Sequence, residues 1–183
     1  MKEVYLDNAA TTKADPEVVT KINQALTKDY GNPSSLHNKG LVAENLIKDA
    51  RQKIANSINV KAKEIFFTSG GTEANNLAIK GALDILNRYG KRIITTTIEH
   101  PSVLNVFEKL TQEGWDVKYI EVDQEGIVNL DQLEKNLNEE TILVSTMAVN
   151  NELGTIQPLQ KIADLISQHS NLYWHVDGIQ ALG

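Results

Sequence analysis

The sequence predicts an α/β fold of three layers, with a mostly parallel sheet between helices. From residue 64 onward, short apolar segments alternate with longer segments of helical periodicity, which is typical of βαβ units. The segment 142–147 (Ile-Leu-Val-Ser-Thr-Met) is almost continuously apolar, as expected of a strand that is covered on both faces. A chain of 183 residues is long enough for one ordinary domain, or for one domain and part of another.

Two helices are predicted before the alternating pattern begins. Asp15 and Pro16 suit the N-cap and the first turn of a helix that runs to about Asp29. We expect its inward face to carry Val18, Val19, Ile22 and Leu26. The turn residues of segment 31–40 predict an irregular loop. A long amphipathic helix then runs to about Ile58, and its apolar stripe consists of Val42, Leu46, Ile47 and Ile54.

The alternating region predicts five strands and four helices. The strands are expected near 64–68, 92–97, 117–122, 141–147 and 172–177. The helices are expected near 73–89, 101–113, 130–138 and 158–169. We therefore divide the chain into an N-terminal segment with two helices, residues 1–60, and a partial large domain built on the sheet, residues 61–183.

The segment 64–73 (Glu-Ile-Phe-Phe-Thr-Ser-Gly-Gly-Thr-Glu) joins the first predicted strand to the helix that follows it. Its residues 65–67 form an apolar run of good strand formers, for which we expect a buried strand. The next helix has one face that carries Leu77, Ala78, Gly81, Ala82 and Ile85. A strand, a glycine turn and a helix in this order place free backbone N–H groups at the positive end of the helix dipole.

This glycine turn is a candidate phosphate cradle. Gly70 and Gly71 have no Cβ, so an anion can approach the backbone closely, and Thr72 adds a hydroxyl donor. The alternative is a simple capped turn, with Ser69 or Thr72 as the N-cap and Glu73 in the first helical turn. The turn matches neither a P-loop nor a dinucleotide-binding glycine motif.

Polar residues also follow the other predicted strands. They are Glu99 and His100 after the second strand, Asn150 and Asn151 after the fourth, and His175 and Asp177 in the fifth. Ligands of parallel sheets lie at the carboxyl ends of the strands, so we expect these side chains to share one rim with the phosphate cradle. Each has a structural alternative, because His100 could cap a helix, the asparagines could form Asx-turns, and Asp177 could cap the next turn.

The composition narrows the classes of function. The net charge of −6 and the pI of about 5.2, without a basic block, argue against a nucleic-acid or anionic-membrane surface. There is no signal peptide and no apolar run long enough to span a bilayer, so we expect a cytoplasmic protein. Cysteine is absent, which excludes disulfides and thiolate ligands within this chain. His175 and Asp177 share a strand face, but no third ligand has useful spacing, and we predict no metal site.

Six motifs resemble those of a known enzyme family. They are Tyr5-Leu-Asp-Asn-Ala-Ala-Thr-Thr12, Tyr30-Gly-Asn-Pro-Ser-Ser35, Phe67-Thr-Ser-Gly-Gly-Thr-Glu73, Glu99-His100, Val149-Asn-Asn-Glu-Leu-Gly154, and His175-Val-Asp177 with Gln180-Ala-Leu-Gly183. In this order and with these spacings they resemble the cysteine desulfurases, pyridoxal 5′-phosphate enzymes of the class V aminotransferase group, particularly the type that serves iron–sulfur cluster assembly. The resemblance implies the large domain of the aspartate-aminotransferase-like fold (fold type I), truncated.

The resemblance implies roles for the residues of the rim. Gly71 and Thr72 would hold the cofactor phosphate through backbone N–H and hydroxyl groups. His100 would lie over the pyridine ring as a stacking plate and acid/base candidate. Asp177 would pair with the pyridine nitrogen and keep it protonated, so that the ring acts as an electron sink.

The remaining implied roles concern the substrate and the partners. Gln180 would donate to the 3-oxygen of the ring, and Asn151 would lie near that oxygen and the substrate carboxylate. The substrate would be L-cysteine, whose sulfur passes to an enzyme cysteine as a persulfide and leaves L-alanine. The resemblance further implies a homodimer, with a sulfur-acceptor or scaffold protein as partner of the complete enzyme. A truncated domain would expose sheet edges and apolar dimer surface, so we expect self-association or poor solubility.

The chain departs from the family pattern mainly in what it lacks. The family's Schiff-base lysine, persulfide cysteine and substrate-binding arginine lie beyond Gly183, and Lys80 lies within a helix, where it cannot replace that lysine. Gly178 stands where relatives usually carry alanine, which loosens the turn after Asp177. We therefore expect the chain alone to be inactive. The alternatives are a selenocysteine lyase, another class V enzyme, or a non-catalytic protein that binds a phosphate compound or a partner.

Overall fold

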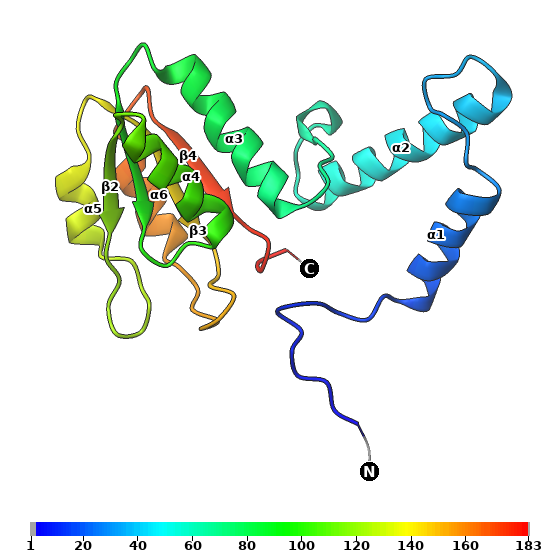
Figure 1. Ribbon diagram of the computed structural model, residues 1–183, viewed down its shortest axis with the longest axis horizontal. Helices are drawn as coiled ribbons and strands as arrows, with labels where there is room; N and C mark the ends of the chain where they lie inside the picture. The colour runs from blue at the N-terminus through cyan, green and yellow to red at the C-terminus, as the bar shows by residue number, and fades with distance from the viewer. Residues whose placement is uncertain (1–2, 183) are drawn as a thin grey trace. The chain divides into compact units, whose positions relative to one another are not determined.

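The computed structural model describes residues 3–182 and divides the chain into two compact units, one ending at Phe67 and one beginning at Thr68 (Figure 1). The first unit contains α1 (Pro16–Thr27), α2 (Asn38–Ser57) and the short 3₁₀ helix η1 (Ala62–Glu64). The second contains every strand of the described residues and four further helices. Gly183, the last residue of one sequence motif, lies outside the described residues.

Both predicted helices of the first unit are confirmed. The side chain of Asp15 accepts a hydrogen bond from the Glu17 N–H at 2.8 Å, and Pro16 occupies the first turn, where its missing N–H leaves no donor unpaired. The ring Nδ1 of His37 caps α2 by accepting from the Gly40 N–H at 3.3 Å. Local capping chemistry therefore accounts for where these two helices begin.

The prediction that α1 turns its apolar face inward is wrong, because Val18, Val19, Ile22 and Leu26 are all exposed. The side chains of the predicted apolar stripe of α2 are exposed as well (Val42, Leu46, Ile47 and Ile54). Within the described part of the chain, α1 has no buried residue, and α2 buries only Gly40, Ala43 and Ala55. Helical periodicity identifies side chains that share a face, but burial also requires an element that covers the face.

The predicted buried strand near 64–68 is also absent from the structure. Residue 64 ends η1, Phe66 and Phe67 are exposed, and the segment forms no ladder with the described strands. The backbone at Ile65 is nevertheless extended, with φ −93° and ψ 125°. An apolar run sets strand propensity, but a strand exists only where a second strand supplies hydrogen-bond partners.

The other four predicted strands are confirmed and form one parallel sheet. They are β1 (Arg92–Thr96), β2 (Asp116–Ile120), β3 (Thr141–Met147) and β4 (Tyr173–Asp177), in the order β2-β1-β3-β4. All seven residues of the central strand β3 are buried, as its continuously apolar sequence predicted. All four strands run the same way, so their carboxyl ends meet at one rim.

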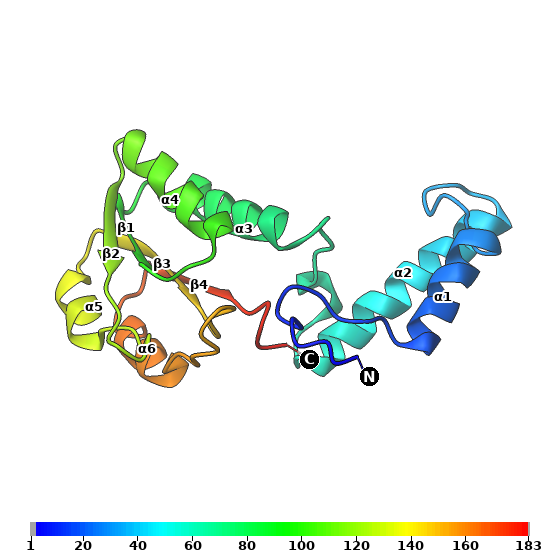
Figure 2. The ribbon, with the colours of Figure 1, turned by 60° about the horizontal axis from the view of Figure 1, so that its bottom comes forward.

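Helices cover both faces of this sheet, which confirms the α/β fold with three layers. Figure 2 shows α3 (Gly71–Leu86) and α4 (Pro101–Gln112) on one face and α5 (Leu130–Asn136) and α6 (Leu159–Ile166) on the other. One core lies under α3 and α4, around Ile79, Phe107 and Leu143, and the second lies under α5 and α6, around Leu133 and Ile162. No helix of the described residues combines the length and apolar character needed to span a membrane.

The buried face of α3 differs from the face that its apolar residues indicated. Asn75, Ile79, Leu83 and Leu86 are buried, whereas Leu77 and Ile85 are exposed. Asn75, Ile79 and Leu83 follow an i, i+4, i+8 spacing. Because Asn75 is polar, apolar periodicity alone does not identify this face as the buried one. The face that we selected instead borders a groove beside β4.

Candidate functional site

The N-terminus of α3 is open to an anion. Its N-cap is Gly70, in an extended conformation (φ 164°, ψ −179°), and no side chain of the described residues caps the helix. Neither Ser69 nor Thr72, the residues of the simple capped turn, is the N-cap. Glu73, in the first turn of the helix, accepts the Ser69 N–H at 2.6 Å, and this hydrogen bond lowers the pKa of the exposed Glu73 carboxyl. A Cβ at Gly70 would meet no atom within 4 Å, so the space before the helix is free.

The carboxyl end of β4 adjoins this helix terminus. A Cβ on Gly71 would lie 3.0 Å from Cδ1 of Ile179, so the start of α3 and the turn after β4 are in close contact. The N–H of Ile179 donates to Oδ1 of Asp177 at 3.1 Å, so the carboxylate caps its own turn, as the structural alternative predicted. Asp177 itself is 9% exposed. The candidate phosphate cradle and the buried acid therefore share one site.

Asn75 joins three elements at this site. Its side-chain amide donates to Oδ2 of Asp177 and to Oγ of Ser102, each at 2.9 Å. Asn75 lies in the second turn of α3, Ser102 in the first turn of α4, and Asp177 at the end of β4. A buried carboxylate needs hydrogen-bond donors to offset its desolvation, and this amide supplies one of them.

His100 caps α4, which the structural alternative for this residue predicted. Its Nδ1 accepts from the Ser102 N–H at 3.1 Å and lies 2.8 Å from the Ser102 Oγ. The side chain is exposed, and the ring is connected through Ser102 and Asn75 to Asp177. His100 can therefore cap α4 and also belong to the candidate site, because the N-terminus of α4 is part of the rim.

Glu99 is a buried acid between the ends of two strands. Its Oε1 accepts from the Met147 N–H at 2.8 Å and from the Thr96 hydroxyl at 2.7 Å, while Oε2 has no partner among the described residues. Burial raises the pKa of Glu99 from 4.5 to about 7, the two hydrogen bonds oppose that rise, and the nearby Asp177 adds to it. The Glu99 side chain thus accepts the N–H of Met147, the last residue of β3, at a point where β1 has already ended.

Asn150 organises the loop that carries Asn151. Its Oδ1 accepts from the N–H groups of Glu152 and Leu153 at 2.9 and 2.8 Å, which is the predicted Asx-turn. Its Nδ2 donates to the Ile98 carbonyl at 3.1 Å and so joins two loops of the rim. Between these loops lies a cavity of about 530 Å³, lined by residues 97–101 and 150–153. Asn151 and His100 line this same cavity.

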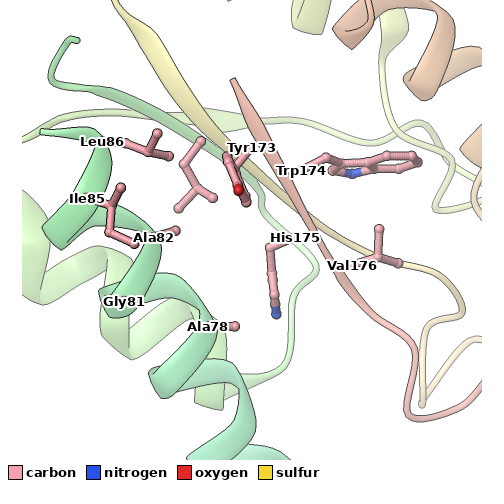
Figure 3. A pocket seen from close by; sticks show the side chains of 10 residues that line it. Ala78, Gly81, Ala82, Ile85, Leu86, Tyr173, Trp174, His175 and Val176 are labelled. Carbon is pink, nitrogen blue, oxygen red and sulfur yellow. The ribbon is translucent and has the colours of Figure 1, made fainter. Parts of the chain in front are cut away.

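His175 faces α3 from within the sheet (Figure 3). Its Nδ1 lies 2.8 Å from the Ser145 Oγ, and burial lowers its pKa below 6.5 although Asp177 opposes this shift. The ring borders a groove of about 390 Å³ between α3 and β4, together with Ala78, Gly81 and Tyr173. His175 and Asp177 share the α3 face, as predicted. Within the described residues, no three metal-ligating side chains cluster.

The rim therefore collects most of the site residues that the sequence indicated. Gly71, Asp177 and His100 are linked through the contacts described above. Thr72 follows Gly71 in the first turn of α3, and its side chain is exposed. Gln180 lies in the turn after β4, and its side chain is also exposed. Asn151 lines the cavity together with His100.

Sequence reasoning missed two residues of the site. Asn75 and Ser102 hold the hydrogen-bond network together, yet they lie inside predicted helices rather than at strand ends. The signal for Asn75 was an asparagine at the position where the i, i+4 pattern of Ile79 and Leu83 requires a buried residue. Ser102 gave no comparable signal, because a serine in the first turn of a helix is common for local reasons.

The chemistry of this rim suits a ligand with an anionic end and a basic ring nitrogen. The uncapped N-terminus of α3 offers N–H groups and the positive end of the helix dipole to a phosphate. Asp177 offers a buried carboxylate that can accept from a protonated nitrogen. The residues present therefore fit pyridoxal 5′-phosphate.

Comparisons with known proteins match nearly the whole of this chain. The family model described as aminotransferase class V matches residues 4–183. A "NifS/IcsS protein homolog" of Lactobacillus delbrueckii subsp. bulgaricus is 47% identical over 98% of this chain and 47% of its own length. "Cysteine desulfurase IscS" of Dictyoglomus turgidum is 45% identical over 100% of this chain and 46% of its own length.

The fold is shared with a solved structure described as a NifS-like protein. The TM-score is 0.95 at 40% sequence identity, over 98% of this chain and 50% of the solved one. The chain spans about half the length of the curated relatives it matches. The similarity covers both units of the chain.

Proposed function

The chain belongs to the aminotransferase class V family, and we propose that the protein containing these 183 residues is a pyridoxal 5′-phosphate-dependent cysteine desulfurase. The observation that carries the proposal is the convergence of the α3 N-terminus, the α4 N-terminus and the end of β4 on Asn75. The names of relatives at 45–47% identity give the reaction class. The contacts of this chain supply the physical argument.

In this proposal the first turn of α3 binds the cofactor phosphate. The backbone N–H groups of Gly71 and Thr72, together with the Thr72 hydroxyl, donate to its oxygens. Support comes from the missing side-chain cap and from the free space before Gly70. Glycine suits position 70 because a side chain there would extend into the space that the phosphate needs.

Asp177 would accept a hydrogen bond from the pyridine nitrogen and so keep that nitrogen protonated. Its two oxygens already accept from Asn75 and from the Ile179 N–H, and these bonds fix the carboxylate in place while leaving lone pairs for a third donor. When bound, the cofactor supplies an electron sink for bonds at the substrate Cα, and the protonated nitrogen maintains it. Gln180 orients the ring by donating to its 3-oxygen.

His100 and Asn151 would contact the ring and the substrate. His100 would stack on the ring and serve as an acid/base candidate, and Asn151 would orient the substrate carboxylate. Both residues line the cavity of about 530 Å³ between the two rim loops. The exposure of His100 supports a role in contacting a ligand, because its Nδ1 is already committed to the helix.

The proposed reaction converts L-cysteine to L-alanine. The C–S bond of the substrate breaks, its sulfur joins an enzyme thiol as a persulfide, and a proton replaces it on the carbon. The 183 residues contain no cysteine, so the thiol belongs to a segment outside them, as does the lysine that binds the cofactor covalently. A cytoplasmic homodimer that passes sulfur to an acceptor for iron–sulfur cluster assembly is part of the same proposal.

The proposal is tested by incubating the longer protein that contains this chain with L-cysteine and cofactor. We expect L-alanine and protein-bound persulfide in equal amounts. Asp177→Asn should lower kcat/KM by about 10²-fold or more, a typical loss for one preorganised electrostatic contact, whereas Asp164→Asn on the exposed side of α6 should not change it. Absence of alanine from protein that holds the cofactor would overturn the proposal. A strong preference for selenocysteine would identify a lyase of that substrate instead.

A further inference from the structure

The amide of Asn75 has only one orientation that satisfies its neighbours. Asp177 is a carboxylate and can only accept hydrogen bonds, so the nitrogen of the amide, not its oxygen, must face it. The same nitrogen donates its second N–H to the Ser102 Oγ at 2.9 Å. Asn75 is 6% exposed, so water does not readily replace either bond. The Asp177 carboxylate therefore fixes the Asn75 amide nitrogen as the donor in both hydrogen bonds, to Asp177 and to Ser102.

This orientation determines what the Ser102 hydroxyl can do. Because its oxygen already accepts from Asn75, the hydroxyl proton is free to be donated elsewhere. The nearest acceptor is Nδ1 of His100, at 2.8 Å. The backbone N–H of Ser102 is directed at the same ring nitrogen, at 3.1 Å. Two donors therefore meet Nδ1, which can accept them only if it carries no proton.

We infer that Asn75 and Ser102 are positioning residues that hold His100 as the neutral tautomer with its proton on Nε2. The chain of bonds runs from Asp177 through Asn75 and Ser102 to the imidazole, and each donor has one acceptor. The opposite tautomer would place the Nδ1 proton against the Ser102 N–H, where two donors would face each other. The network thus presents an N–H group, rather than a lone pair, from the exposed side of the ring.

This inference deepens the proposed function, on which it rests for the identity of the ligand that His100 meets. A ring fixed in this way offers its Nε2–H group as a hydrogen-bond donor to a cofactor or substrate atom. The network itself exists without any ligand. Its test is therefore independent of cofactor binding and of catalysis.

The experiment is a long-range ¹H–¹⁵N correlation spectrum of the 183-residue chain with ¹⁵N-labelled histidine and no cofactor. The spectrum is recorded at a pH high enough that the ring signals no longer change. The signals of His100 are identified by their loss in His100→Gln. We expect Nδ1 in the unprotonated range and Nε2 in the protonated range. Protonated Nδ1 in the unsubstituted chain would overturn the inference at once.

Three variants test whether the neighbours cause this tautomer. Ser102→Ala removes the hydroxyl, and Asn75→Leu removes the donor that orients it, so in each the ratio of Nε2–H to Nδ1–H tautomer should fall about tenfold, the loss expected for one net hydrogen bond. Ser102→Thr keeps a hydroxyl and should restore the original ratio. Asn76→Leu, which removes an amide that donates to the Thr72 carbonyl of its own helix, is the matched control.

The inference stays testable even if one of these variants fails to fold. The dispersion of the backbone amide spectrum shows which variants are folded, and Ser102→Thr is the mildest change. An unchanged ratio in folded Ser102→Ala or Asn75→Leu would contradict the inference, as would an equal shift in Asn76→Leu. A chain that shows the expected tautomer but binds no pyridoxal 5′-phosphate would contradict the proposed function and leave this inference standing.

Discussion

The helices α1 and α4 begin alike and end up in opposite environments. Each has twelve residues, a side-chain N-cap and a proline at its start. Among the described residues, α1 buries none of its side chains, whereas α4 buries Ser102, Val103, Val106, Phe107 and Leu110. The difference lies in what covers them, because α4 packs on the sheet and against α3.

The same contrast separates the two units of the chain. Residues from Thr68 onward have two cores around a four-stranded sheet. The residues described before them bury only the small side chains of Ala43 and Ala55 among their apolar residues. Local sequence is therefore enough to form a helix, but the free energy of burial depends on a neighbour. The candidate site follows the same division, since every residue proposed for it lies in the second unit.

The largest expected effect comes from removing one core side chain in each unit. Ile79 in α3 is 0% exposed and Ile47 in α2 is 39% exposed. Ile79→Ala should lower the free energy of unfolding by about 2–5 kcal/mol, because it leaves a cavity, whereas Ile47→Ala should change it by about 0.5 kcal/mol or less. Urea unfolding followed by circular dichroism measures both. Equal losses would mean that the first unit has a core comparable to that of the second.

The second expected effect is a pH dependence from Glu99, inside the second unit. Its pKa is about 7 in the folded state against 4.5 ordinarily, so the folded state binds the proton more tightly. Its contribution to stability is therefore full below about pH 4.5, is lost as the pH rises toward 7, and stays lost above. Glu99→Gln should remove a penalty on the order of 3 kcal/mol at pH 8 and no penalty near pH 4.

Urea unfolding at several pH values measures this difference between the parent chain and Glu99→Gln. Asp164→Asn, an exposed acid on α6, serves as the control and should not alter the pH profile. A gap between Glu99→Gln and the parent that widens as the pH falls would show that the sign of the pKa shift is wrong.

A smaller effect separates two matched helix caps. Asn129 caps α5 by accepting the Gln132 N–H at 2.9 Å, and Asp15 caps α1 by accepting the Glu17 N–H at 2.8 Å. Asn129→Ala should destabilise the sheet unit by about 1 kcal/mol, whereas Asp15→Ala should fray α1 without changing that transition. Tryptophan fluorescence reports the sheet unit alone, because Trp115 and Trp174 both lie in it. A comparable shift in Asp15→Ala would show that the units unfold together.

The smallest effect concerns the turn after Asp177. The backbone of Gly178 does not lie in the left-handed region, and a Cβ there would meet no atom within 4 Å. Gly178→Ala should therefore stabilise the chain by about 0.4–1 kcal/mol, since it restricts the unfolded state without strain. Thermal unfolding measures the gain. A loss of stability would mean that the turn needs the freedom of glycine.

The sequence predicted the sheet unit well because its signals are local and mutually consistent. The run at 142–147 and the alternation of strands with helices depend on neighbouring residues alone, and all four paired strands were found. The rule that ligands lie at strand ends predicts from the sequence alone that Gly71, His100 and Asp177 share one rim. Family resemblance then assigned a role to each of them.

The failures of prediction share one physical cause. The apolar residues of 65–67 indicated a strand, and those of α1 indicated an inward face, but each requires a partner element that the described residues do not supply. The bridge formed by Asn75 was missed for a related reason, since its role depends on Asp177, which is 102 residues away in sequence. Contacts at such separation cannot be read from local pattern.

The most direct test of the central claim is a titration of the 183-residue chain with pyridoxal 5′-phosphate, followed by absorbance and tryptophan fluorescence. The account predicts saturable binding that is weakened by Asp177→Asn, which removes the charge facing the ring nitrogen, and by Gly70→Ala, which places a methyl group in the open space before α3. Gly81→Ala, the same change on α3 where a Cβ also meets no atom within 4 Å, should bind like the parent chain. No saturable binding by the folded chain, or equal binding by all three variants, would contradict the account.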